Sequence, residues 1–137
     1  MFTGIVEEVG KINSIVEEEI SIKCEKILEN SKIGDSISVS GICLTITKIK
    51  QDNLSFQISE ETKSKTILGK KQNLNYVNLE RAATFESRIG GHLIEGHVEN
   101  TAICKEINQL KDSTNVIFEA NPDVISNIIV KGYICID

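Results

Sequence analysis

The fold is decided by the stretch Ile42-Cys43-Leu44-Thr45-Ile46-Thr47-Lys48-Ile49, in which most residues are β-branched. Such residues favour strands and disfavour helices. Asp52-Asn53 then marks a hairpin turn, since both residue types favour turns. After it, Leu54, Phe56 and Ile58 alternate with polar residues, which is typical of a half-buried strand. The stretch therefore predicts two neighbouring strands.

The same alternation recurs on both sides of this hairpin, at Ile20–Cys24 and at Val77–Leu79. The chain contains 23 Ile and 9 Val against 8 Leu, and only one Pro, which again favours strands. Two helices are expected, a short one at Thr62–Leu68 and a two-turn helix that opens at Asn121-Pro122 and ends near Lys131-Gly132. Short, regularly spaced strands with few helices predict an all-β protein built as a small closed barrel.

Composition and charge exclude several classes of protein. The 137 residues are 40% hydrophobic and 26% charged, a balance that supports a globular core. No apolar run approaches the ~18 residues of a membrane span. The net charge of −5 argues against nucleic acid and anionic membranes as partners. The start, Met1–Glu8, lacks the basic region of a signal peptide, so a cytoplasmic location is expected.

Cysteine and histidine spacing gives no metal signature. The cysteines at 24, 43, 104 and 135 form no C-x-x-C pair, so we expect free thiols in a reducing compartment, with Cys24, Cys104 and Cys135 buried as small apolar residues. His92 and His97 are five residues apart, and a regular strand would point them to opposite faces. No metal site is therefore expected.

A weak internal repeat divides the chain. Thr3–Glu7 aligns with Glu95–Glu99 at an offset of 92, and Ile33–Ser40 aligns with Val130–Asp137 at an offset of 97. The second unit then stops about halfway. Residues 1–91 are predicted to form a first barrel, and residues 92–137 the first half of a second one. The half barrel is expected to expose apolar faces, Ile103/Ile107 and Val116/Phe118, and to drive self-association.

Four motifs together resemble the riboflavin synthase family, in the family's order and spacing. They are the start Met1–Glu7, Gly34-Asp35-Ser36 followed by Gly41–Thr45, Asn78–Ala82, and the histidine-containing stretch Gly90–Val98. The resemblance implies two similar six-stranded Greek-key barrels, of which this chain supplies the first and half of the second.

The resemblance also implies an activity. Two molecules of 6,7-dimethyl-8-ribityllumazine exchange a four-carbon unit, giving riboflavin and 5-amino-6-(ribitylamino)uracil without a metal or bound cofactor. The two substrates lie between barrels of neighbouring subunits, so the family implies a homo-oligomer, a trimer for the full-length protein. Because the two rings are held face to face, much of the catalysis is proximity and orientation.

Site residues follow from the same motifs. The resemblance implies catalytic roles for His97, Cys43 and Phe2. It implies first-barrel substrate contacts for Gly4, Ile5, Val6, Cys43, Leu44, Thr45, Gln57, Ile58, Ser59, Glu60, Glu61 and Thr62. It implies second-barrel contacts for Gly96, His97, Val98 and Lys131. Two positions depart from the family: Ser40 replaces a usual Asn, and Gln57 replaces a frequent Asp, which argues against a general base at that position.

Plainer interpretations stay open for these residues. Cys43 and His97 could be an ordinary core thiol and surface histidine, Glu80 and Arg81 a surface or interface pair, and Gly90-Gly91 a linker between barrels. At the level of the protein, a non-catalytic lumazine- or flavin-binding protein is the alternative to the enzyme. A Greek-key barrel of another role is the third interpretation.

Overall fold

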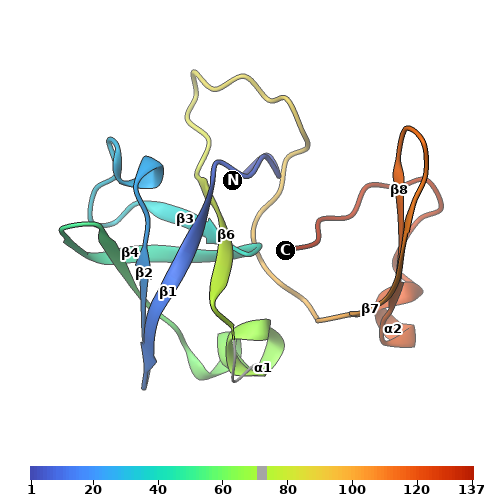
Figure 1. The fold of residues 1–137 in the computed structure, drawn as a ribbon, viewed down its shortest axis with the longest axis horizontal. Coiled ribbons are helices and arrows are strands. Elements are labelled where there is room, and N and C mark those ends of the chain that lie inside the picture. The colour runs from blue at the N-terminus through green and yellow to red at the C-terminus, as the bar shows by residue number, and fades with distance from the viewer. Residues whose placement is uncertain (71–73) are drawn as a thin grey trace.

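A computed structural model describes residues 1–70 and 74–137 of the chain. Its main body is a closed six-stranded antiparallel barrel in the order β1-β2-β5-β4-β3-β6 (Figure 1). Strands β3, β4 and β5 follow one another as hairpins and β2 lies beside β5, which is a Greek-key arrangement. The predicted fold class is confirmed. The strand bounds are β1 Glu8–Val16, β2 Glu19–Lys23, β3 Ser36–Val39, β4 Ile42–Lys50, β5 Asn53–Gln57 and β6 Tyr76–Arg81.

The barrel closes around the alternating apolar residues that the sequence marks out. Ile20 and Ile22 on β2 face Phe56 and Leu54 on β5, and all four side chains are fully buried. Opposite residues of an antiparallel pair share a face, so these pairs fill the barrel interior. The other members of the core are Cys24, Ile27, Ile37, Val39, Ile42, Leu44, Ile46, Ile58, Leu68, Val77 and Leu79.

Tight turns join the hairpins where the sequence places polar residues. The β1–β2 turn lies at the acidic residues 17–18, with Glu17 at a φ of 52°. The β3–β4 turn consists of Ser40 and Gly41, whose φ values are 45° and 80°. Two consecutive positive φ values identify a type I′-like turn, whose twist matches that of the strands it joins.

The helices are shorter than the sequence predicts. α1 spans Glu60–Lys65, and the 3-10 helices η1 and η2 span Lys26–Leu28 and Ile67–Gly69. α2 spans only Pro122–Ile125, so the prediction of a two-turn helix ending near Lys131-Gly132 is wrong. The β-branched run Ile128-Ile129-Val130 has low helix propensity, and backbone bonds over three residues replace the helix there.

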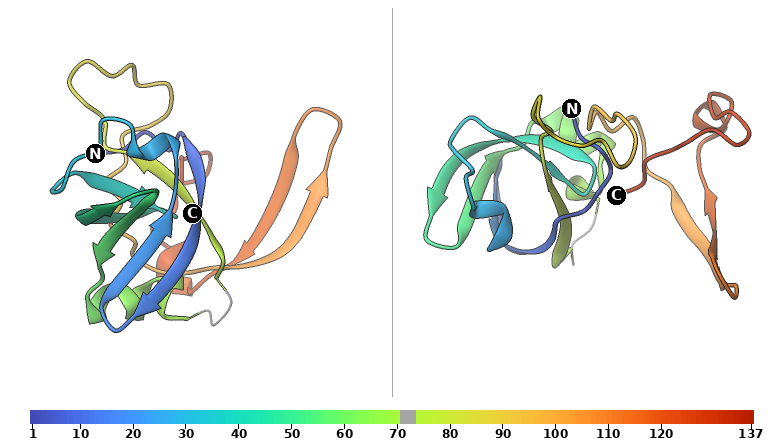
Figure 2. Two further views of the ribbon diagram at one scale, coloured as in Figure 1. Left: turned by 60° about the vertical axis from the view of Figure 1, so that its left-hand side comes forward. Right: turned by 90° about the horizontal axis from the view of Figure 1, so that it is seen from above.

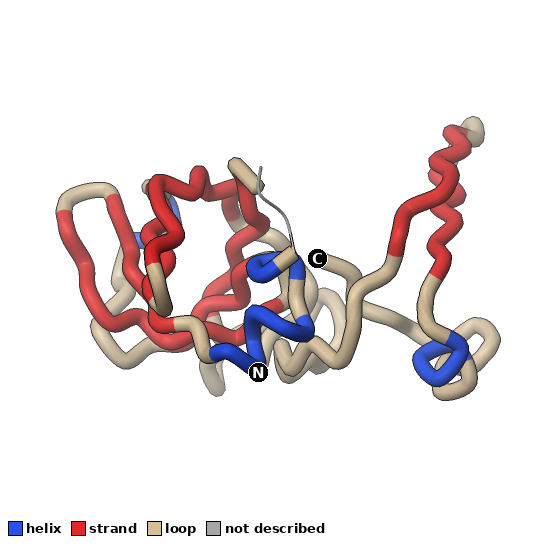
Figure 3. The backbone as a smooth tube through the Cα atoms, turned by 90° about the horizontal axis from the view of Figure 1, so that it is seen from below, coloured by secondary structure: helices blue, strands red, loops and turns tan. Residues whose placement is uncertain are grey.

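Residues 103–119 form a separate hairpin that stands off the barrel. β7 (Ile103–Gln109) pairs with β8 (Thr114–Glu119), and Figures 2 and 3 show this hairpin projecting away from the barrel strands. Ile103, Ile107 and Val116 are 63%, 67% and 38% exposed, as predicted, whereas Phe118 is half-buried.

Two of the cysteine predictions are wrong, since Cys104 and Cys135 are exposed while Cys24 is buried. Cys104 lies on the projecting hairpin and Cys135 follows α2, so neither reaches the barrel core that buries Cys24. No helix in the described ranges 1–70 and 74–137 is long and apolar enough to cross a membrane.

Candidate functional site

A cavity of about 500 Å³ lies between the beginning of β4 and the end of β5, next to the start of α1. This volume is within the usual range for a small-molecule site. Two predicted segments, at 43–45 and 57–62, meet there because β4 and β5 run antiparallel. The lining residues are Glu18, Cys43, Leu44, Thr45, Thr47, Gln57, Ile58, Ser59, Glu60 and Thr62.

Strand alternation on β4 decides which side chains face away from the core. Ile42 and Leu44 point into the barrel, where each is at most 5% exposed. Cys43 is half-buried and Thr45 is exposed, so this thiol and this hydroxyl lie on the outer face of the strand. The Thr45 hydroxyl can therefore donate and accept hydrogen bonds to a ligand.

The segment after β5 is shaped by a helix cap. Ser59 is the N-cap of α1, and its hydroxyl oxygen accepts the Thr62 N–H at 3.1 Å. The Gln57 side chain donates to Glu18 at 3.4 Å, which ties the end of β5 to the β1–β2 turn. Ile58 is fully buried, while Glu61 does not line the cavity. The polar groups at this end are thus amides, hydroxyls and carboxylates.

Gly96 joins this site from a distant part of the chain. Its carbonyl accepts the Cys43 N–H at 2.8 Å, and its φ is 79°, a conformation that favours glycine. A Cβ at position 96 would lie 2.9 Å from the Cys43 Cβ and 2.9 Å from Cε2 of Phe2. Phe2 itself is fully buried. Three predicted residues, Phe2, Cys43 and Gly96, are therefore in close contact.

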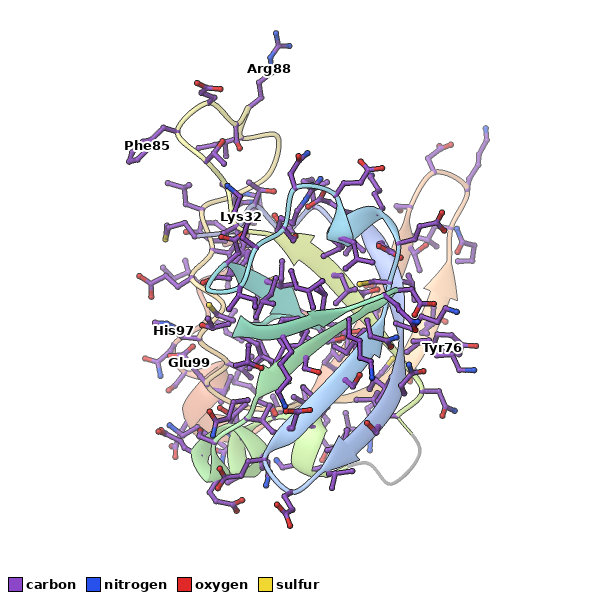
Figure 4. The ribbon with its side chains drawn as sticks, turned by 90° about the vertical axis from the view of Figure 1, so that its left-hand side faces the viewer. Lys32, Tyr76, Phe85, Arg88, His97 and Glu99 are labelled. Carbon is purple, nitrogen blue, oxygen red and sulfur yellow. The ribbon has the colours of Figure 1, made fainter. Side chains whose placement is uncertain are left out.

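His97 follows Gly96 but points outward. Its side chain is 78% exposed, and Nδ1 lies 3.6 Å from Oε2 of Glu95, which is itself 70% exposed. Figure 4 shows His97 and Glu99 together at one edge of the molecule, away from Tyr76. Val98 packs against the barrel core, so the segment alternates between the barrel and solvent.

The remaining predicted residues lie elsewhere. Ile5 lines a separate open hollow of about 800 Å³ beside Glu7 and Arg81. Gly4 and Val6 are exposed and line neither hollow. Lys131 is exposed beyond α2 and lines neither of them. The structure thus brings the 43–45 and 57–62 segments together at the cavity, with Gly96 in contact with Cys43, and leaves His97, Gly4–Val6 and Lys131 outside the cavity.

Glu80 and Arg81 do not form the pair expected from the sequence. Arg81 binds Glu7, with Nη2 and Oε2 2.5 Å apart, whereas Glu80 is only 7% exposed and accepts N–H groups from Thr3 and Gly4. Consecutive residues of a strand point to opposite faces, and this rule could have separated the two. Glu18 and Thr47 of the cavity were also missed, since no motif contains them.

The two histidines lie on irregular backbone, not on the regular strand that the sequence predicts. Only Ile94 in this segment forms a β-bridge, with Phe2. The His92 ring stacks on Tyr133, with centroids 4.3 Å apart and planes at 23°. Within the described residues, no three His, Cys, Asp or Glu side chains are grouped so that they could hold a metal ion.

Comparison with known sequences identifies relatives over the whole chain. Residues 3–82 match the family described as the lumazine binding domain. Riboflavin synthase of Bacillus subtilis is 38% identical over 144 residues, covering all of this chain and 66% of that protein. Riboflavin synthase of Escherichia coli is 35% identical over 143 residues, covering all of this chain and 67% of that protein. The chain thus spans about two thirds of the length of these relatives.

Solved structures with the same fold carry ligands. The crystal structure of LumP complexed with riboflavin matches with a TM-score of 0.82 at 30% identity, covering 94% of this chain and 72% of that chain. The crystal structure of LumP complexed with 6,7-dimethyl-8-(1'-D-ribityl) lumazine matches with a TM-score of 0.79 at 29% identity, covering 90% and 71% of the two chains.

Proposed function

The chain belongs to the lumazine-binding domain family, and on that premise we propose that its first barrel binds 6,7-dimethyl-8-ribityllumazine or riboflavin. The observation that carries the proposal is the cavity where Cys43–Thr45 meets residues 57–62. LumP, which has the same fold, is complexed with these two ligands in its crystal structures. The cavity combines an apolar floor with hydroxyl and amide groups, as recognition of a ring with a polyol tail requires.

Each segment has a part in this binding. The Thr45 hydroxyl hydrogen-bonds the polar edge of the pteridine, and the half-buried Cys43 lies beside it on the outer face of the strand. Gln57, Ser59 and Thr62 present an amide and two hydroxyls to the ribityl chain. Gly96 contacts Cys43 from outside the cavity, where a larger residue would collide with Cys43 and Phe2. Gly4–Val6 contact a first-barrel substrate and Lys131 a second-barrel substrate, each from outside the lining of this cavity.

The reaction that follows is that of riboflavin synthase. One lumazine loses a proton from its 7-methyl group, the other accepts the resulting carbanion at its ring, and transfer of a four-carbon unit yields riboflavin and 5-amino-6-(ribitylamino)uracil. Relatives of that name, at 35–38% identity over the whole chain, support this activity. His97 is the group that moves a proton between the two substrates, because an imidazole has one nitrogen that donates and one that accepts a proton, and its exposed position leaves it free to face a second ligand.

Two stacked lumazines require two sites that face each other, so the active form contains more than one copy of the chain. The exposed apolar faces of the β7–β8 hairpin support association. The four free thiols support a cytoplasmic location. Sedimentation at increasing protein concentration measures the assembly, and a monomer at every concentration would contradict it.

Fluorescence titration with riboflavin tests the binding site. We expect one ligand per chain with a Kd near 1 μM, or about −8 kcal/mol. Thr45→Val should weaken binding about tenfold, because the ligand loses one hydrogen bond in a partly dry site. Thr114→Val, on the projecting hairpin, is the matched control and should leave the Kd unchanged. A folded wild-type protein that does not bind would contradict the proposal.

A non-catalytic lumazine- or flavin-binding role is the second candidate, favoured by the similarity to LumP with bound riboflavin. Incubation with 6,7-dimethyl-8-ribityllumazine, followed by chromatography for riboflavin, separates the two roles. Residues 1–137 supply only half of the second barrel and should turn over poorly, so the assay uses a chain with both barrels complete: the enzyme then produces riboflavin, and His97→Ala lowers its turnover about 100-fold, as expected for the loss of an acid–base group. Ligand binding without any product would favour the second role.

A further inference from the structure

Glu80 is a buried carboxylate that binds the N-terminal segment. It is 7% exposed, and it lies next to the last residue of β6. Oε1 accepts the Thr3 N–H at 2.6 Å and the Thr3 hydroxyl at 2.7 Å, and Oε2 accepts the Gly4 N–H at 3.0 Å. Within residues 1–70 and 74–137, no basic side chain forms an ion pair with it. Its partners are therefore the donors of two consecutive residues near the N-terminus.

This arrangement is costly unless all of these bonds form. Burying a carboxylate is unfavourable unless donors replace the water that it loses. Three charge-assisted hydrogen bonds supply that replacement, and such bonds are about twice as strong as neutral ones. An N-terminal segment that only covered the barrel would not need a buried carboxylate such as that of Glu80. The bonds from Glu80 therefore fix Thr3 and Gly4 in one place.

Glu80 lies in the same row as Cys43. In the sheet, Glu80 of β6 is directly opposite Ser38 of β3, and Ser38 is directly opposite Cys43 of β4. Opposite residues share a face of the sheet, and the neighbouring residues on these strands fill the barrel core. The three side chains thus lie on the outer face, and the row leads from the N-terminal segment to the cavity.

Phe2 completes the connection between the two ends of this row. It precedes the anchored Thr3, and it exchanges backbone hydrogen bonds of 2.7 and 3.0 Å with Ile94. Its ring lies against Gly96, whose carbonyl accepts the Cys43 N–H. Each contact is made by a buried or hydrogen-bonded group, so a shift of Thr3 and Gly4 would move Phe2 and release the segment around Gly96.

We infer that Glu80 is a positioning residue for the ligand site: by anchoring Thr3 and Gly4 it places Phe2 against Gly96 and keeps Gly96 and His97 beside Cys43. The inference rests on the proposed function for its effect on ligand binding. Its effect on the surroundings of Cys43 does not depend on any ligand. Glu80 itself lines the other hollow and not the ligand cavity, so it acts through the segment that it binds.

Glu80→Gln is the informative substitution, because it keeps the size of the side chain. The amide has one acceptor oxygen, so in either orientation its NH₂ group faces an N–H of Thr3 or Gly4. Val77→Ala is the matched control, since Val77 is a core residue on the same strand that does not contact Thr3. It destabilises the barrel but leaves the Glu80 bonds intact.

Two measurements decide the inference in the purified chain. The first is the rate at which iodoacetamide alkylates Cys43, with Cys104 as internal reference. Glu80→Gln should raise this rate about tenfold, because Gly96 no longer shields the thiol. A tenfold change is the size expected when the segment loses the stabilisation of about one hydrogen bond. Val77→Ala should leave the ratio of the Cys43 rate to the Cys104 rate within twofold of wild type.

The second measurement is the riboflavin Kd in a double-mutant cycle with Phe2→Ala. Glu80→Gln should weaken binding about tenfold in the wild-type background and less than twofold in the Phe2→Ala background, because coupled residues are not additive. Equal effects in both backgrounds, or a Cys43 rate unchanged by Glu80→Gln, would overturn the inference. If wild type binds no riboflavin, the proposed function fails, and the Cys43 rate alone decides the role of Glu80.

Discussion

Phe2 and Ile94 pair as an isolated antiparallel bridge, with Phe2 N–H donating to Ile94 O at 2.7 Å and Ile94 N–H donating to Phe2 O at 3.0 Å. Ile94 lies 92 residues after Phe2, which is the offset that aligns Thr3–Glu7 with Glu95–Glu99. Equivalent positions of the two repeats thus form reciprocal backbone hydrogen bonds with each other. Such an exchange is the relationship that a local two-fold axis produces.

The similarity of the two repeats continues at the glycine that follows in each segment. Gly4 and Gly96 are equivalent positions, and both have a φ of 79°. Their surroundings differ, because Val98 packs against the barrel core while Ile5 and Val6 are 52% and 46% exposed. A segment of the second repeat therefore packs against the first barrel, through Val98 at the core and Gly96 at Cys43.

Gly96→Ala tests this closing contact. The new Cβ would meet Cys43 and Phe2, and alanine is strained at positive φ. We expect unfolding by urea to show a loss of about 2–4 kcal/mol, since strain and overpacking add. Gly34→Ala is the control, because its φ is 96° but no atom lies within 4 Å of its Cβ. It should lose only about 1–2 kcal/mol. Equal losses in the two variants would contradict a contact at Gly96.

The β3–β4 turn offers a stabilising substitution. Ser40 has a φ of 45°, and its hydroxyl oxygen accepts the Asn78 N–H at 3.2 Å. Asparagine tolerates this backbone better, favours type I′ turns and keeps an acceptor oxygen. Ser40→Asn should raise the free energy of unfolding by about 0.5 kcal/mol. Ser40→Val should lower it by at least about 1 kcal/mol, because a β-branched residue is strained there. Thermal unfolding of both variants measures the difference, and a less stable Ser40→Asn protein would disprove the argument.

The Glu7–Arg81 ion pair predicts a pH dependence of stability. Partial burial by itself would raise the pKa of Glu7. The hydrogen bonds and the positive charge of Arg81 lower it by more, so the pKa of Glu7 is below its ordinary value. A depressed folded-state pKa stabilises the protein above the unfolded pKa of about 4.3. This contribution is lost as the pH falls through the folded-state pKa.

Urea unfolding of wild type and Glu7→Gln at several pH values measures this effect. The two proteins should differ by about 1 kcal/mol at neutral pH, and the difference should shrink as the pH falls below the unfolded pKa of about 4.3. Glu61→Gln removes an exposed ion pair with Lys65 and should change stability by less than about 0.5 kcal/mol. A Glu7→Gln difference that stays constant over this range would refute the assignment.

Local sequence periodicity predicts the barrel because each strand carries its own signal. Ile20, Ile22, Leu54 and Phe56 alternate with polar residues, and this pattern alone decides which face is buried. The segment 57–62 was placed near Cys43–Thr45 only by family resemblance. The contact between Gly96 and Cys43 joins residues more than 50 positions apart, and no local pattern encodes it. The same holds for Glu80 and Thr3, which are 77 positions apart.

The alkylation rates of three cysteines report on the core, the cavity and the hairpin in one sample. Cys24 is 4% exposed, and burial raises the pKa of its thiol to about 12. Cys43 is half-buried in the wall of the cavity, and Cys104 is exposed on the hairpin. Because the thiolate is the reactive form, iodoacetamide at pH 8 should modify Cys104 first, Cys43 more slowly and Cys24 only after unfolding.

Riboflavin should protect Cys43 alone, because that thiol is the one that lines the cavity. With riboflavin at ten times its Kd, only about one site in eleven is empty, so the Cys43 rate should fall about tenfold. The Cys104 rate should not change, which excludes a general effect of riboflavin on the reagent. Mass spectrometry of the digested protein follows each cysteine separately. A Cys43 rate unaffected by bound riboflavin would mean that the ligand occupies another part of the molecule, with the hollow beside Ile5 as the next place to examine.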